Sequence, residues 1–132
     1  MPLLTRTFIK TAVVYFMVAL LLGVYMVARS KTGLFPVYIH LFVFGWLTQL
    51  IFGVIYWMFP KYSKANPRGY EVLGWVAYST LNMGLILRAI VEPLHAVQAS
   101  DASGILLVVS AILQWLSGLA FVVNTWPRIK EK

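Results

Sequence analysis

The chain has 132 residues, of which 61% are hydrophobic and only 11% are charged. A soluble domain of this length could not cover so much apolar surface with so few charges. The composition therefore excludes most soluble enzyme folds and indicates a protein embedded in a lipid bilayer. The net charge of +7 does not indicate a nucleic-acid partner here, because the bases cluster at the ends of apolar runs. The chain has no cysteine, which excludes disulfides, thiolate nucleophiles and cysteine-ligated metal sites.

Four apolar runs are long enough to cross a membrane as helices, since a bilayer core needs about 20 apolar residues. They are residues 8–28, 37–59, 72–91 and 104–126. The connections between them are short and contain Pro, Gly or polar residues that suit a helix end. The sequence therefore predicts an all-α integral membrane protein with one domain, an antiparallel bundle of four transmembrane helices.

The distribution of Lys and Arg predicts the orientation of this bundle. Eight of these residues flank the spans on one side: Arg6, Lys10, Lys61, Lys64, Arg68, Arg128, Lys130 and Lys132. The other side has only Arg29 and Lys31, while Arg88 lies inside the third span. We therefore expect both termini to face the cytoplasm.

The second span carries a histidine about one turn from its start. At 100° per residue, His40 shares a face with Phe44 and other bulky apolar residues, against which a flat apolar cofactor could lie. The opposite face carries small and polar residues of the kind that allow close helix approach, namely Gly45, Gln49, Gly53 and Tyr56. This pattern predicts a helix at the centre of the bundle or at a homodimer contact. The positions expected to allow such a dimer contact are Gly45, Gly53, Thr80 and Gly84.

The third span carries a polar stripe of Arg88, Glu92 and His95 at spacings of four and three residues, with Gly84 one turn before it. An arginine at this depth costs about 2.5 to 3.5 kcal/mol on insertion scales, so it needs a partner, either Glu92 or a carboxylate of a ligand. We expect Pro93 to kink or end the helix, with His95 just beyond. Since the second and third spans run in opposite directions, His40 and His95 are predicted at similar depths near the outer side.

Two neutral imidazoles at one depth could supply the axial nitrogens of a heme iron. Several alternatives remain open. His40 could be a buried histidine hydrogen-bonded to another helix, His95 an interfacial residue in contact with water, and Arg88 with Glu92 a structural ion pair. The histidines could also bind copper or zinc, with further ligands from Glu92, Asp101, Met or water.

The segment from residue 38 to residue 60 has a pattern that resembles the second transmembrane helix of heme-copper oxidase subunit I, most closely in its nitric oxide reductase and C-type oxidase branches. The matching residues are His40, Gly45, Trp46, Gly53, Tyr56 and Pro60. The first span is compatible with the first helix of that family. The resemblance implies that His40 is an axial ligand of a low-spin heme. The oxygen-reducing centre of the family uses several further histidines on later helices, and this chain has only His95 to offer. It is therefore not expected to be a complete oxidase or reductase on its own.

The sequence thus predicts a small membrane protein that binds heme b, in the cytoplasmic membrane of a bacterium or archaeon. The residues expected around the heme are His40, His95, Arg88, Arg29, Phe44 and Gly84. The histidines would ligate the iron, and either arginine would neutralise propionates. The expected function is one-electron transfer or gas binding, and no residue is expected to be catalytic. The protein is expected to form a homodimer and to have a respiratory-chain partner. The alternatives are a cofactor-free structural or assembly subunit of a respiratory complex, or a membrane protein that binds copper or zinc.

Overall fold

The computed structural model describes residues 1–31 and 33–130, and within them all regular structure is helical. The elements are α1 (Leu3–Arg29), α2 (Phe35–His40), the π-helix η1 (Leu41–Thr48), α3 (Gln49–Met58), α4 (Glu71–Val97), α5 (Asp101–Thr125) and the 3₁₀ turn η2 (Trp126–Arg128). Four helical rods, with α2, η1 and α3 joined into one, are long and apolar enough to cross a membrane. The predicted all-helical class is confirmed, as is the presence of four helices long and apolar enough to span a membrane, while their insertion and orientation stay predictions.

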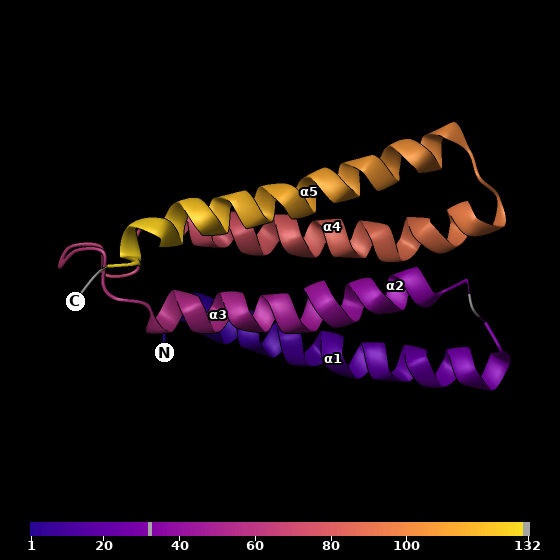
Figure 1. Cartoon of the computed structure of the whole chain (residues 1–132), viewed down its shortest axis with the longest axis horizontal. Coiled ribbons are helices and arrows are strands. Elements are labelled where there is room, and N and C mark those ends of the chain that lie inside the picture. The colour runs from indigo at the N-terminus through magenta and orange to yellow at the C-terminus, as the bar shows by residue number, and fades with distance from the viewer. Residues whose placement is uncertain (32, 131–132) are drawn as a thin grey trace.

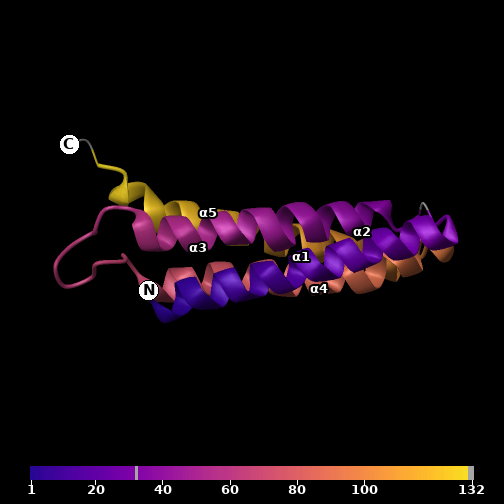
Figure 2. The same ribbon diagram turned by 90° about the horizontal axis from the view of Figure 1, so that it is seen from below.

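The rods form two antiparallel hairpins that lie side by side (Figure 1). The first hairpin pairs α1 with the rod made of α2, η1 and α3, and the second pairs α4 with α5. The same arrangement is seen from below in Figure 2, where both ends of the chain lie at one end of the bundle. We call this the terminal end, and the end with residues 30–31, 33–34 and 98–100 the far end.

The helices are longer than the apolar runs predicted, and the largest difference is at Pro93. The helix α4 continues through Pro93 to Val97, so His95 lies in its last turn and not beyond its end. Proline removes only one backbone donor, and membrane helices tolerate that loss where neighbouring groups satisfy the freed carbonyl. Of the two outcomes expected at Pro93, a kink or an end of the helix, the end is therefore wrong.

Small residues bring the helices of each hairpin close together. A Cβ added at Gly45 would lie 2.7 Å from Cγ of Tyr15, and one added at Gly53 would lie 2.8 Å from Cβ of Phe8. In the second hairpin, the buried Ser110 donates a hydrogen bond to the carbonyl of Gly84 at 2.7 Å. The close-contact positions predicted at Gly45, Gly53 and Gly84 are thus used within the chain, and the homodimer stays a prediction.

The two hairpins contact each other through aromatic rings in the terminal half of the bundle. Phe8 of α1 packs edge-on against Tyr78 of α4, with ring centroids 5.2 Å apart. Phe52 of α3 stacks on Phe121 of α5 at 3.9 Å. Because such contacts add specific geometry to apolar packing, they fix the two hairpins relative to each other.

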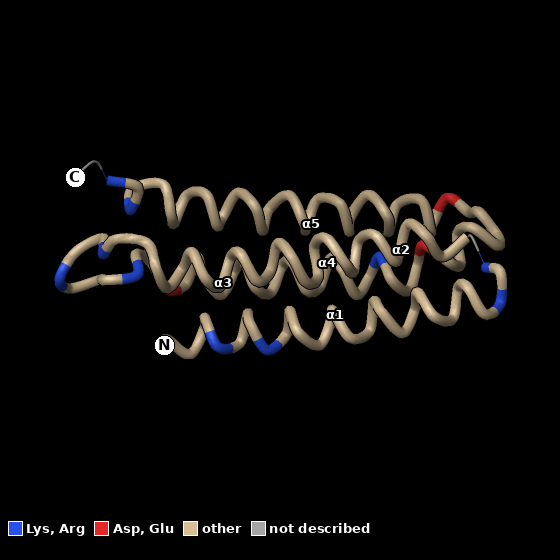
Figure 3. Tube along the Cα trace, turned by 60° about the horizontal axis from the view of Figure 1, so that its bottom comes forward, with Lys and Arg blue, Asp and Glu red and all other residues tan. Residues whose placement is uncertain are grey.

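Basic residues gather at the terminal end (Figure 3). The C-terminal Arg128 is completely buried there, and it donates hydrogen bonds to the carbonyls of Phe59 at 2.8 Å and Pro60 at 2.9 Å. Arg68 donates to the carbonyl of Trp57. These carbonyls belong to the last turn of α3 and the residues after it, so the arginines satisfy acceptors that a helix end leaves free. Lys132, which the sequence places on the same side, lies outside the described residues.

Candidate functional site

His40 is the last residue of α2, and its imidazole is held in one orientation. Its Nδ1 lies 2.8 Å from the carbonyl oxygen of Pro36. A carbonyl can only accept a hydrogen bond, so in the neutral ring Nδ1 carries the proton and Nε2 keeps a free lone pair. The ring is also stacked on Phe44, with centroids 5.5 Å apart and planes 23° from parallel. A histidine that donates one ring N–H to a backbone carbonyl and leaves its other nitrogen free has the arrangement of a metal ligand.

A π-helix begins directly after His40. Residues Leu41–Thr48 adopt this wider helix, in which each backbone N–H bonds to the carbonyl five residues back. Such segments are rare and occur frequently at functional sites. Sequence reasoning missed it, and the one available signal was Gly45, whose missing side chain makes room for Tyr15 of α1.

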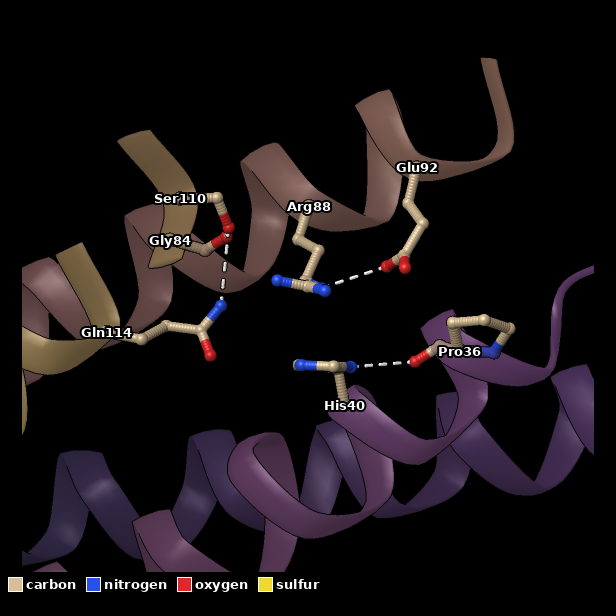
Figure 4. Close-up of polar contacts among 7 residues, drawn as sticks. All are labelled: Pro36, His40, Gly84, Arg88, Glu92, Ser110 and Gln114. Carbon is tan, nitrogen blue, oxygen red and sulfur yellow. Dashed lines mark hydrogen bonds and ion pairs between the residues drawn. The ribbon is translucent and has the colours of Figure 1, made fainter. Parts of the chain in front are cut away.

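Arg88 of α4 lies across from His40, between the two hairpins (Figure 4). Its Nε donates to Oε2 of Glu92 at 2.9 Å, and the two side chains are 21% and 15% exposed. The ion pair predicted at this spacing is therefore present, and it offsets part of the cost of a charge among apolar helices. Glu92 engages only Nε, so among the described residues the two Nη nitrogens of Arg88 have no hydrogen-bond partner.

His95 belongs to a different part of the molecule. Its Nδ1 lies 2.6 Å from Oγ of Ser103, which itself donates to the carbonyl of Ser100 in the capping box of α5. Seven residues separate it from Arg88, which corresponds to about 10 Å along the helix axis. The bond from His95 to Ser103 thus stabilises the turn between α4 and α5. Within the described chain, the structure shows no contact between the imidazoles of His40 and His95.

The remaining predicted residues are also separate from His40. Arg29 is the last residue of α1 and is exposed at the far end. Gly84 lies against α5, where a Cβ would come within 3.0 Å of Gln114 and of the Ser110 carbonyl. The structure therefore brings together His40, Phe44 and Arg88, leaves His95 and Gly84 in contacts with α5, and leaves Arg29 exposed at the far end.

The ligand chemistry available in the described residues is limited. No group of three or more His, Asp or Glu side chains lies there in an arrangement that could hold a metal ion. Structural and catalytic zinc sites use three or four protein ligands, whereas a heme iron already has four ring nitrogens and takes only axial ligands from the protein. His40 offers one free nitrogen, which is enough for an axial position on a heme iron and fewer than the three or four protein ligands of a zinc site.

No protein-family model, curated protein or solved structure matches this chain. The likeness of residues 38–60 to a heme-ligand helix consequently depends on those residues alone.

Proposed function

We propose that this protein is a small membrane protein that binds a b-type heme through His40 and works in one-electron transfer or gas binding. The observation that carries the proposal is the orientation of His40. Its Nδ1 proton is engaged by the Pro36 carbonyl, while Nε2 is free between two apolar hairpins and across from Arg88. The resemblance of the helix around His40 to the heme-ligand helix of heme-copper oxidases supports the same assignment.

Each neighbouring residue has a role in this proposal. When bound, the heme would supply a reversible one-electron centre or an iron that takes up a small gas. Pro36 keeps the imidazole in the tautomer that leaves Nε2 free, and Phe44 holds the ring plane by stacking. The free Nη nitrogens of Arg88 can pair with a propionate carboxylate while Nε stays with Glu92.

The second axial position is proposed to be open or to be filled from another chain. His95 would have to leave Ser103 and move towards His40 to reach an iron bound there. A ligand from a second copy would make the site a homodimer contact, and a ligand from another subunit would make it an interface with a respiratory-chain partner. An open position would allow a gas to bind.

The proposal is tested by the absorption spectrum of the protein, produced with heme supplied and purified in detergent. We expect a Soret band, sharp bands after dithionite reduction, and a pyridine hemochrome of heme b. One heme per chain would place the site within a protomer, and one per two chains would place it between protomers. A colourless, well-folded protein obtained under these conditions would rule out the proposal and favour the structural subunit.

We further propose that the terminal end faces the cytoplasm of a bacterium or archaeon, because the Lys and Arg residues gather there. We expect a C-terminal alkaline phosphatase fusion to be inactive and a C-terminal green fluorescent protein fusion to be fluorescent. The same reporters inserted at residues 98–100 should give the reverse pattern. An active C-terminal phosphatase fusion would mean that the bundle is inserted the other way round.

A further inference from the structure

Two carboxamides in the middle of the bundle connect the hairpins. Gln49, the first residue of α3, is completely buried, and its Oε1 accepts a hydrogen bond from Nδ2 of Asn82 in α4 at 2.7 Å. The Nε2 of Gln49 donates to the carbonyl of Gly45 at 3.0 Å. The Gln49 carboxamide thus forms one hydrogen bond within the first hairpin, through Nε2, and one to the second hairpin, through Oε1.

The bond to Gly45 replaces a backbone bond of an ordinary α-helix. In an α-helix the backbone N–H of residue 49 would donate to the carbonyl of residue 45. Here that N–H bonds to the carbonyl of Trp46, at the end of the π-helix. Instead, the side-chain Nε2 of Gln49 donates to the Gly45 carbonyl, the acceptor that its backbone N–H would use in an α-helix. Gln49 therefore stabilises the wide turns that begin directly after His40.

The register of η1 determines where His40 points. Each residue of an α-helix turns the chain by about 100° about the helix axis, and each residue of a π-helix turns it by less. If η1 became α-helical, α2 and its His40 would therefore rotate about the axis relative to α3. Asn82 lies on α4 six residues before Arg88. The contact between Gln49 and Asn82 consequently fixes His40 on one hairpin relative to Arg88 on the other.

We propose that Gln49 and Asn82 are positioning residues for His40, which act by holding η1 in its π register against α4. The proposal rests on the proposed function only for the identity of the group that His40 binds. Neither carboxamide contacts the imidazole, so they act through the backbone between residues 40 and 49 and not as ligands.

The test is a comparison of histidine ring nitrogen resonances in ¹⁵N-histidine-labelled protein without added heme. We expect Gln49→Leu and Asn82→Leu to shift the His40 ring resonances, because the imidazole moves relative to the charge of Arg88, while its bond to Pro36 within α2 is kept. His95 is the internal reference, since it is held by Ser103 in the other hairpin. In protein loaded with heme, the same variants should shift the reduction potential at an unchanged ratio of heme to chain.

The matched control is Thr80→Val, which removes a polar group of α4 whose hydroxyl bonds only within its own helix, to the carbonyls of Val76 and Ala77. It should leave the His40 resonances unchanged. Unchanged His40 resonances in both leucine variants would overturn the proposal. If Gln49→Leu does not fold, the His40 resonances of Asn82→Leu alone test the proposal, because this variant leaves the bond from Gln49 to Gly45 intact. If wild-type protein binds no heme, the proposed function fails while the resonance comparison still decides this inference.

Discussion

Replacing His40 by alanine is expected to reduce the heme content of the purified protein to near zero. The neutral imidazole is the only side chain among His40, Phe44 and Arg88 that can offer a nitrogen lone pair to an iron, because its Nδ1 is engaged by Pro36 and its Nε2 is not. Without it, the heme would keep only apolar contacts and the pairing of a propionate with Arg88. The measurement is the pyridine hemochrome ratio of heme to chain for wild type and variant produced side by side.

The matched control is His95→Ala, which makes the same substitution at the only other histidine of the chain. Because His95 lies about 10 Å along α4 from Arg88 and its Nδ1 bonds to Ser103 in the α4–α5 turn, we expect this variant to retain heme with a spectrum close to that of wild type. Loss of heme in both variants would instead identify His95 as the second axial ligand. Full heme retention by His40→Ala would contradict the assignment of His40.

The sequence predicted the number, order and antiparallel arrangement of the helices, because apolar run length and short polar connections are local properties of the chain. It also predicted that the face with Gly45, Gln49, Gly53 and Tyr56 packs against other helices, but it expected the His40 face to be occupied as well. Gln49 is completely buried and Tyr56 is 3% exposed, whereas Leu47 and Ile51, on the face that carries His40, are 44% and 45% exposed. This division follows from the helical period alone.

The features that sequence reasoning missed depend on contacts between distant residues. The π-helix after His40 is stabilised by Gln49 and by the ring of Tyr15 opposite Gly45, and neither contact can be read from an apolar pattern. The predicted meeting of His40 and His95 relied on depth alone. Depth does not specify which neighbour a side chain faces, and His95 faces the α5 cap through Ser103.

The role of Arg128 also depends on contacts with distant residues and was not predicted. From the sequence, Arg128 was only one of the bases that set the orientation. In the structure it is the largest fully buried side chain. Its guanidinium also lies 5.8 Å from the ring of Tyr56, a distance at which a cation and an aromatic face attract each other. A positive charge near the end of the chain therefore has a packing role that a count of flanking bases does not reveal.

Replacing Arg128 by alanine is accordingly expected to destabilise the bundle by about 2 to 4 kcal/mol, the scale of losing hydrogen bonds from a buried charged group. The variant would leave the carbonyls of Phe59 and Pro60 without their donors and open a cavity beside Tyr56. The two hairpins would lose the contact that joins the C-terminal end of α5 to the end of α3. The measurement is the unfolding midpoint of detergent-purified protein during titration with a denaturing detergent.

Lys130→Ala is the matched control, because Lys130 also donates to carbonyls of the same loop, those of Lys61 and Tyr62, but from an exposed position. Hydrogen bonds from an exposed side chain contribute little because water replaces them, so its midpoint should stay close to that of wild type. Arg128→Lys should fall between the two, since an ammonium keeps the charge but lacks the planar fork that reaches two carbonyls at once. Equal midpoints for Arg128→Ala and Lys130→Ala would show that the buried guanidinium does not hold the hairpins together. An intermediate midpoint for Arg128→Lys would separate the part of the effect due to charge from the part due to the geometry of the guanidinium.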